Sequence, residues 1–403
     1  MRQIIYVWNY REWGGAQIYF LSLMKQAKKS YHVTALIPAN SEPKILQYLN
    51  SLQISIEFLQ NSSLPDSKYG LLGRLANRIT IHRSESQMVR NILARPNIAD
   101  AIFHIDLGFW QSFFSLFRLC RKTNVFMTIH TGLPLYTGWR KLRWQIKGKV
   151  ISRFSSFHLL ASNQEAKGSL QPYIGSQKFA QVDVTYSGID PVEITNVINI
   201  LPAKTEILKR YGLPENKTIL MTVGQFIERK GCWVLLESLK QLKDAGREFV
   251  FVWLSTTLPD AETLKKVESY GLGSSFRLID SEEIGQTRED MLTLLSSADI
   301  FILASLQEGL PIALIEAMAL GLPCITTNVN AIPEAILDGQ TGVLVPPRDS
   351  IQLSKAIASL LDDPLHRDSL GAAAKKTAFD KFNAQTTAER TLKLYDDVWQ
   401  TNR

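Results

Sequence analysis

The sequence predicts an α/β protein built from two doubly wound domains, each with a parallel sheet covered by helices on both faces. Three observations support this fold class. Short apolar segments alternate with amphipathic helical segments along both halves of the chain, which is typical of parallel sheets buried between helices. The 403 residues are enough for two or three domains. With 45% hydrophobic and 21% charged residues, the composition is that of an ordinary globular protein.

Each predicted strand is short, apolar and bounded by polar or turn-forming residues. In the first half the strands are 4–8, 32–38, 101–105, 125–130 and 157–161. In the second half they are 219–223, 249–254, 275–279, 300–304, 323–326 and 342–345. Amphipathic periodicity predicts helices between them, among which are 16–28, 232–245, 288–297 and 311–320. Ligands of such Rossmann-like sheets bind at the carboxyl ends of the strands, so the loops there are where a site is expected.

A connector marks the boundary between the two domains. Gly188 and Pro191 close the last element of the first half, and a stretch without a clear element follows up to about residue 200. We therefore expect one domain at 1–190 and a second at 191–383. The remaining segment, 384–403, is again helical and carries apolar anchors.

The charge is divided unevenly between the two halves. The chain has a net charge of +7, but its first 195 residues hold 23 Lys and Arg against 11 Asp and Glu. The remainder holds 22 against 27. From Leu107 to Gln164 there is no acidic residue at all. An anionic partner therefore belongs to the first half.

Two basic segments of that half are candidates for contact with a membrane surface. The first interleaves cations with tryptophan, as a membrane–water interface favours; its residues are Trp139, Arg140, Lys141, Arg143, Trp144 and Lys147. The second, 69–83, combines an apolar helical stripe of three leucines and Ile79 with Arg74, Arg78 and Arg83, and Lys68 directly precedes it. The alternative is a pair of solvated helices whose Trp and Leu side chains pack into the core. Nucleic acid is not expected as a partner, because no recognisable binding module accompanies the basic residues.

The cysteines and the N-terminus point to a cytoplasmic protein, peripheral at the inner face of the membrane. Cys120, Cys232 and Cys324 lie far apart, which excludes a disulfide framework and fits a reducing compartment. No run approaches the ~18 apolar residues of a membrane span. The first residues look like a strand and not like a signal peptide.

The strongest chemical signal follows the predicted strand 300–304 and opens a helix. Glu308 and Gly309 precede the helix, Pro311 suits its first position, and Glu316 lies about one and a half turns inside it. The free N–H groups of a first helical turn make an anion site suited to a diphosphate. A carboxylate accepts two hydroxyl donors, so the two glutamates suit the diols of a sugar. Alone, such a pair is better explained by an ordinary N-terminal glutamate and one surface glutamate on an amphipathic helix.

Two further loops and one histidine end other strands. The loop from Gly224 to Gly231 carries Arg229 and Lys230, which can bring cations to a phosphate. A Gly14–Gly15 pair separates the first strand from the first helix, and His130 ends a strand where it can bind a hydroxyl or accept a proton. Each feature alone has a structural explanation: a solvated basic loop, a tight turn, a buried histidine. Four such features in order, each at a strand end, favour a single site.

Together these residues resemble the retaining glycosyltransferases of the Glu-x7-Glu type, the large family 4 with the GT-B fold. The resemblance covers nearly the whole chain and is clearest over 223–347. It implies that Glu316 holds the nucleotide ribose and that Glu308 lies near the hydroxyls of the donor sugar. Gly309, Leu310 and the amides after them would meet the sugar or the diphosphate, and Lys230 would bind the diphosphate.

The resemblance also implies roles for the rest of the chain. Gly15 would approach the diphosphate from the other side of a central cleft between the domains, His130 would face the reacting sugar, and the last helix, 384–403, would cross back onto the first domain. One departure concerns phosphate binding: the family often has arginine where this chain has Gln225, and Arg229 is expected to compensate.

The implied function is transfer of a sugar from a nucleotide-diphosphate donor to a lipid-linked or polysaccharide acceptor, with retention at the anomeric carbon. No cofactor is expected, and no metal, since the sequence has no Asp-x-Asp and no clustered His or Cys residues. Two alternatives stay open: a nucleotide-sugar 2-epimerase of the same fold, and a non-catalytic sugar-binding relative. The epimerase needs several acid–base groups around the sugar, and only His130 stands out.

Overall fold

The computed structural model describes residues 2–8, 10–11, 14–59, 83, 86–87, 89–95, 98–106, 113–255, 258–285 and 287–401. The chain forms two compact units. Unit 1 comprises Met1–Ser187 together with Ala384–Arg403, and unit 2 comprises Gly188–Asn383. The first division lies three residues before the expected end at 190, and the second coincides with the expected end at 383.

Unit 1 contains a seven-stranded parallel sheet in the order β3-β2-β1-β4-β5-β6-β7. Its strands are β1 (Gln3–Val7), β2 (His32–Pro38), β3 (Ser55–Leu59), β4 (Ile102–Asp106), β5 (Asn124–Ile129), β6 (Phe157–Ala161) and β7 (Asp183–Val184). The sequence analysis missed β3 and β7. Both are edge strands: β3 has no fully buried residue and β7 has two residues only, so neither has the continuous apolar run of the interior strands.

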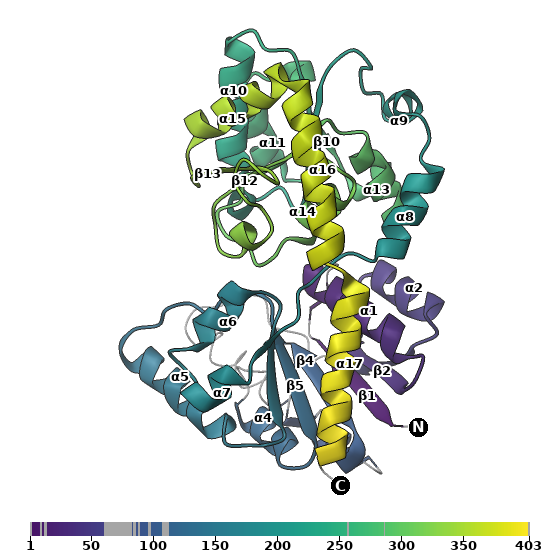
Figure 1. Cartoon of the computed structure of the whole chain (residues 1–403), viewed down its shortest axis with the longest axis vertical. Coiled ribbons are helices and arrows are strands. Elements are labelled where there is room, and N and C mark those ends of the chain that lie inside the picture. The colour runs from purple at the N-terminus through teal and green to yellow at the C-terminus, as the bar shows by residue number, and fades with distance from the viewer. Residues whose placement is uncertain are drawn as a thin grey trace. The chain divides into compact units, whose positions relative to one another are not determined.

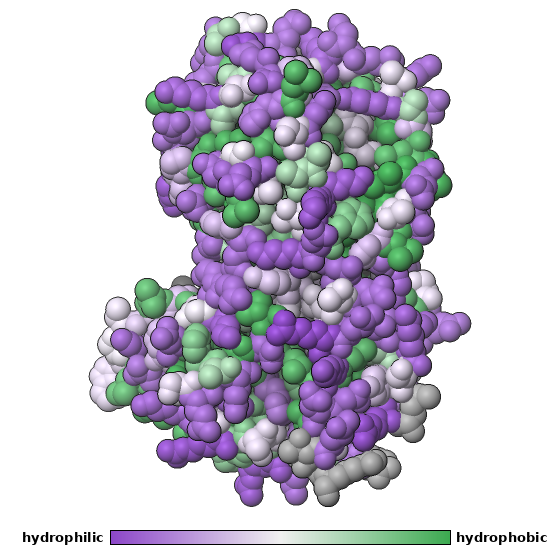
Figure 2. All heavy atoms as spheres, in the orientation of Figure 1, coloured by the Kyte–Doolittle hydropathy of each residue, from purple (hydrophilic) through white to green (hydrophobic). Residues whose placement is uncertain are grey.

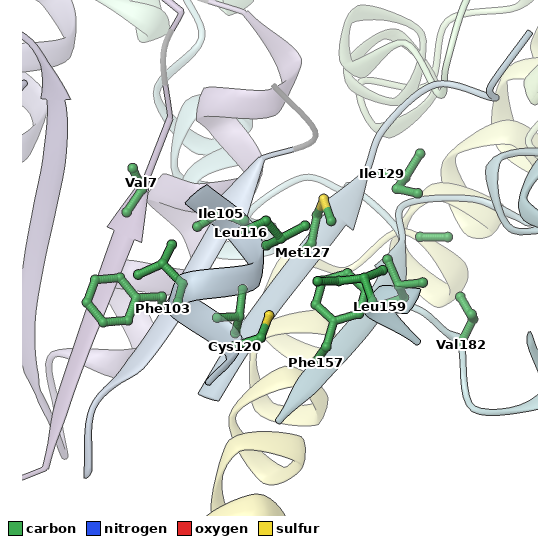
Figure 3. Packing of buried hydrophobic residues seen from close by; sticks show 14 of the residues in the cluster. Val7, Phe103, Ile105, Leu116, Cys120, Met127, Ile129, Phe157, Leu159 and Val182 are labelled. Carbon is green, nitrogen blue, oxygen red and sulfur yellow. The ribbon is translucent and has the colours of Figure 1, made fainter. Parts of the chain in front are cut away.

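Helices cover both faces of this sheet, as the alternation of side chains along β1 requires. Ile5 and Val7 join the core under α4 (Phe113–Cys120), α5 (Gly138–Ile151), α6 (Gln164–Leu170) and α7 (Ser176–Ala180). Ile4 and Tyr6 join the core under α1 (Gly15–Ala27), α2 (Pro43–Ser51) and α17 (Ala384–Thr401). Figure 3 shows the first of these cores, with side chains of α4 packed on those of β4, β5 and β6.

The C-terminal helix α17 belongs to unit 1, where it runs beside α1 (Figure 1). Polar contacts fix its register on the sheet. The hydroxyl of Tyr395 contacts Nδ1 of the buried His104, and Trp399 Nε1 donates to the carbonyl of Asp100 at 2.8 Å. The helix is thus an integral layer of the N-terminal unit.

Unit 2 contains a six-stranded parallel sheet in the order β10-β9-β8-β11-β12-β13. Its strands are β8 (Ile219–Val223), β9 (Val250–Leu254), β10 (Phe276–Ile279), β11 (Ile300–Leu303), β12 (Cys324–Thr327) and β13 (Val343–Val345). Its helices are α8 (Pro191–Ile200), α9 (Lys204–Arg210), α10 (Cys232–Asp244), α11 (Ala261–Glu268), α12 (Ser281–Ile284), α13 (Arg288–Ser296), α14 (Ile312–Ala319), α15 (Ser350–Asp362) and α16 (Pro364–Lys381). α10 and α15 share one apolar core on the sheet, and α14 packs against α16.

Both sheets reverse their winding direction next to the first strand of the unit. In unit 1 the reversal lies between β1 and β4, and in unit 2 between β8 and β11. The predicted fold class, two doubly wound domains with parallel sheets, is therefore confirmed. At such a switch point the loops after two neighbouring strands diverge and leave a crevice, which is where ligands of this architecture bind.

Candidate functional site

The loop that follows β8, at the switch point of unit 2, bends back on the sheet and carries Lys230. A 3-10 turn, η3 (Glu228–Lys230), leads into Gly231, whose φ is 72°. A Cβ atom at Gly231 would lie 1.9 Å from the carbonyl oxygen of Ala304, just after β11. This position therefore needs glycine for its backbone conformation and for its close approach to the neighbouring loop.

The loop that follows β11 is tied to this first loop and holds Glu308. The amide of Leu306 donates to the carbonyl of Arg229 at 2.8 Å. Within the loop, Ser305 Oγ donates to Glu308 Oε1 at 2.6 Å, and the Glu308 amide donates to Asn330 Oδ1 at 3.2 Å. Ser305 thus holds the side chain of Glu308, and Asn330 holds its backbone.

Lys230, Arg229 and Glu308 form one charged cluster across the two loops. The ammonium of Lys230 lies 2.6 Å from Glu308 Oε1, and the guanidinium of Arg229 lies 3.7 Å from Oε2. The side chains of Lys230 and Glu308 are only 15% and 7% exposed. Two cations face one carboxylate, so the cluster carries one net positive charge and retains N–H donors for an anion.

Helix α14 begins one residue later than predicted. Pro311 is its N-cap, with extended backbone, and the helix starts at Ile312. The carbonyl of Pro311 accepts the amides of Leu314 and Ile315. The helical hydrogen bonds therefore begin at the carbonyl of Pro311. The amides of Ile312 and Ala313, in the first turn, have no carbonyl partner within the helix. These two amides lie where the sequence predicts a helix-start anion site.

Glu316 lies in the middle of α14 and is 2% exposed. Burial raises the pKa of its carboxyl, and the guanidinium of Arg288, which contacts it, opposes this shift. The structure thus places the two predicted glutamates in different ion pairs, Glu308 with Lys230 and Glu316 with Arg288. The other predicted donor residues of unit 2 lie in the loops described above: Gln225 and Gly309 are half-buried and Leu310 is buried.

A second polar group lies at the switch point of unit 1. Gly15, exposed, is the first residue of α1, and His130 follows β5. His130 Nε2 lies 3.6 Å from Oδ2 of the buried Asp106, which ends β4. Tyr10 donates to the other oxygen of Asp106 at 3.3 Å. The structure therefore gives His130 an acidic neighbour that the sequence analysis did not identify.

His130 is held neutral by its surroundings, since burial lowers its pKa from 6.5 to about 4. Such a group contributes stability above its unfolded pKa, and this contribution is lost as the pH falls through the folded value. We expect the wild type to lose about 2 kcal/mol more stability between pH 7 and pH 4.5 than His130→Gln loses. The comparison is made by denaturant unfolding at both pH values, with His32→Gln, an exposed histidine, as control. An equal loss of stability in all three proteins would contradict the conclusion that burial keeps His130 neutral.

The predicted membrane-surface residues all lie on α5. Trp139 is 85% exposed, whereas Trp144 is half-buried on the core and stacks on Tyr136 at 5.3 Å between ring centroids. Trp139 therefore lies on the outer face of α5, whereas Trp144 packs partly into the core, as the alternative interpretation expects for that residue. Leu142 and Ile146, 44% and 54% exposed, share the outer face with Trp139.

Cations flank this outer face. Arg140, Lys141 and Arg143 are exposed, and Lys147 is half-buried. Figure 2 shows green apolar atoms among purple hydrophilic ones at the edge of unit 1 that carries α5. The other predicted segment, 69–83, lies outside the described residues apart from Arg83. In the described ranges, no helix has the length and apolar character needed to cross a membrane.

Sequence reasoning missed three charged residues of these sites: Asp106, Arg288 and Glu193. Asp106 had a detectable signal, because it is the first carboxylate after an apolar run that reads as a strand. Arg288 and Glu193 open helices far from Glu316 in the sequence, and nothing local marks them as its neighbours. Over the residues with described positions, no group of three or more His, Cys, Asp or Glu side chains could hold a metal ion.

Comparison with known proteins adds a family match to unit 2. Residues 203–377 match the family model described as "Glycosyl transferases group 1". This stretch contains Lys230, Glu308 and Glu316.

Two curated relatives and one solved structure show the range of the similarity. The chain is 27% identical over 206 residues to N-acetyl-alpha-D-glucosaminyl L-malate synthase of Bacillus anthracis, covering 49% of this chain and 50% of that protein. It is 29% identical over 187 residues, 46% of each chain, to N,N'-diacetylbacillosaminyl-diphospho-undecaprenol alpha-1,3-N-acetylgalactosaminyltransferase of Campylobacter jejuni. The chain thus spans about half the length of the curated relatives it matches. Anabaena Alr3699/HepE, solved with UDP and glucose, has the same fold with a TM-score of 0.75 at 15% identity, over 98% of this chain and 100% of that one.

Proposed function

We propose that this chain is a glycosyltransferase that moves a sugar from a nucleotide-diphosphate donor to a lipid-linked or polysaccharide acceptor, with retention and without a metal. One observation carries the proposal. The region that matches group 1 glycosyl transferases places a lysine, an arginine and a helix start beside two buried carboxylates at the switch point of its sheet. The names of several matched relatives describe sugar-transferring enzymes, and one of them names a diphospho-undecaprenol acceptor.

In the proposed reaction the bond from the anomeric carbon to the diphosphate oxygen breaks, and a bond to an acceptor hydroxyl oxygen forms on the same face. The hydroxyl proton passes to the departing diphosphate. Negative charge grows on that diphosphate, where Lys230 and the first amides of α14 supply preorganised donors. Glu308 accepts hydrogen bonds from hydroxyls of the donor sugar. His130, which is neutral at pH 7, forms a hydrogen bond with a sugar hydroxyl as donor or acceptor.

Cationic side chains and helix amides take the place that a divalent cation has in other phosphate sites, so we propose that no metal or other cofactor is needed. Activity is therefore expected to survive EDTA. Loss of activity in EDTA that Mg²⁺ or Mn²⁺ restores would contradict this part of the proposal.

The reaction class is tested by product analysis. The protein is incubated with UDP-, GDP- and ADP-sugars and a lipid-linked or oligosaccharide acceptor, and the product is examined by proton NMR. An α-linked product from an α-linked donor is expected. An inverted linkage would reject retention, a C2-epimerised sugar would favour the epimerase alternative, and binding without any product would favour a sugar-binding relative.

We further propose that α5 docks this unit on the inner face of an anionic membrane to reach the acceptor. Its outer face combines the apolar side chains of Trp139, Leu142 and Ile146 with flanking cations, and from Leu107 to Gln164 the sequence has no carboxylate to repel an anionic lipid. The free cysteines, all buried, fit a reducing compartment such as the cytoplasm.

Replacing Trp139, Leu142 and Ile146 together with serine is expected to lower binding to vesicles containing phosphatidylglycerol by at least tenfold, because the apolar contact with the interface is lost. Co-sedimentation measures it. The matched control replaces three exposed apolar residues of unit 2, Val192, Ile351 and Leu365, with serine. Wild-type binding that is absent at low salt, or that both variants reduce equally, would discard the docking proposal.

A further inference from the structure

Glu316, Arg288 and Glu193, from three helices of unit 2, form one cluster of charged side chains. Arg288, the first residue of α13, contacts Glu316 Oε1 through its NH2 group. Its Nε lies 3.1 Å from Oε2 of Glu193, in the first turn of α8. The side chains of Arg288, Glu316 and Glu193 are 13%, 3% and 21% exposed. One guanidinium therefore serves two carboxylates in a mostly buried cluster.

The charge on Glu316 depends on both neighbours. Burial has the largest effect and raises the pKa of the Glu316 carboxyl, Arg288 lowers it, and Glu193 raises it. On the other elements packed on α14, Arg367 of α16 has a buried guanidinium nitrogen, but the charges that shift the pKa of Glu316 are those of Arg288 and Glu193. Strands β11 and β12 contain no ionisable side chain apart from Cys324, and the buried residues of α16 are apolar. Lys230 and Arg229 pair with the other glutamate, Glu308.

Protonation would change what Glu316 can do for a ligand. An ionised carboxylate accepts hydrogen bonds at both oxygens, whereas the acid form donates one. Arg288 forms an ion pair with Oε1, and among the described residues this buried oxygen has no hydrogen bond of ordinary geometry. The ionised carboxylate therefore keeps acceptor capacity for a hydroxyl pair of a ligand.

We propose that Arg288 is a positioning residue for donor binding, which keeps Glu316 ionised and turned toward the nucleotide ribose, and that Glu193 weakens this hold by sharing the same guanidinium. The inference rests on the proposed function, because it takes Glu316 to bind the ribose. The inference goes beyond the proposed function because it assigns Arg288 and Glu193 opposite effects on the carboxylate of Glu316.

Two variants, each of which removes one charge, test the proposal through opposite shifts. UDP, GDP and ADP are titrated into the wild type by calorimetry, and the nucleotide that binds most tightly is then measured from pH 5 to pH 8.5. Arg288→Gln is expected to move the loss of affinity on acidification to higher pH, because the guanidinium that favours the ionised carboxylate is gone. Glu193→Gln is expected to move it to lower pH. Arg247→Gln, which removes an exposed ion pair with Asp362, is the control. It is expected to leave the pH at which affinity is lost unchanged.

A ligand-free measurement separates this proposal from the proposed function. A raised carboxyl pKa stabilises the fold at low pH, and that contribution is lost as the pH rises through the folded value. The Tm deficit of Arg288→Gln against wild type is therefore expected to be larger at pH 8 than at pH 5.5. If this holds and no nucleotide binds, the ion-pair cluster stands and the proposed function fails. An equal deficit at both pH values, or pH shifts of both variants in the same direction, would overturn the role of Arg288.

Discussion

A Lys230→Met protein is expected to lose sugar transfer by about two to three orders of magnitude in kcat, the usual cost of removing one preorganised donor from developing negative charge. Methionine keeps the unbranched stem that packs against Gly224, where a Cβ atom would lie 3.3 Å from Cε of the lysine. The change therefore removes the ammonium and little of the packing. Initial rates at saturating donor measure the loss, and Lys376→Met, in an exposed pair with Asp380, is the control.

A second variant separates two causes of that loss. Removing the ammonium also deprives the buried Glu308 of the partner at 2.6 Å, and an unpaired buried carboxylate is itself disruptive. If that were the cause, Lys230→Met would have a lower Tm than the wild type, and Lys230→Met/Glu308→Gln would restore it. We expect the Tm of Lys230→Met to stay near that of the wild type while activity is lost, because Ser305 and Arg229 still contact Glu308 and the missing group is the one that meets the diphosphate. A single variant as active as the wild type would remove Lys230 from the proposed mechanism.

Gly231→Ala is expected to lower the free energy of unfolding of the protein by about 2–5 kcal/mol and to impair transfer in whatever fraction folds. Two penalties add: a left-handed backbone costs an L-residue about 1–2 kcal/mol, and relieving a steric clash in a packed region costs about 1–3 kcal/mol. The clash is with the Ala304 carbonyl, 1.9 Å from the new Cβ. To relieve it, η3 must move away from the β11 loop, and Lys230 must move with it.

Gly246→Ala is the matched control for this variant. Gly246 has φ 75°, close to the 72° of Gly231, but a Cβ atom there would meet nothing within 4 Å. It should lose only the conformational part and keep full activity. Urea unfolding and initial rates compare the two variants. Equal losses at both positions would show that the contact between the two loops does not hold the site.

Much of the fold could be read from the sequence because interior strands of parallel sheets leave a clear pattern. Strand β11 is apolar throughout and β8 is apolar apart from Thr222, and the sequence predicts both within one residue of their observed bounds. The edge strand β3 was not predicted, because its half-buried side chains break that pattern. The predicted start of α14 is one residue too early, because proline fits the first helical position as well as the N-cap position that Pro311 occupies.

The site was predictable where chemistry follows strand ends and not where it depends on helices meeting. Lys230 and Glu308 follow neighbouring strands of one sheet, so their proximity follows from topology. That they pair with one another, and that Glu316 pairs instead with Arg288, depends on side-chain packing between distant segments. The inward turn of Trp144 has the same origin, since composition cannot tell which side of a basic helix meets the core.

The central claim is that Lys230, Glu308 and Glu316 bind an activated sugar through its nucleotide diphosphate. Thermal shift of the wild type, Lys230→Met and Glu316→Gln against a panel of nucleotide sugars tests it most directly. At about 100 times Kd, a bound donor should raise the Tm of the wild type by on the order of 5 °C and leave both variants nearly unchanged. A panel in which no nucleotide sugar raises the Tm, or in which all three proteins shift alike, would contradict the claim.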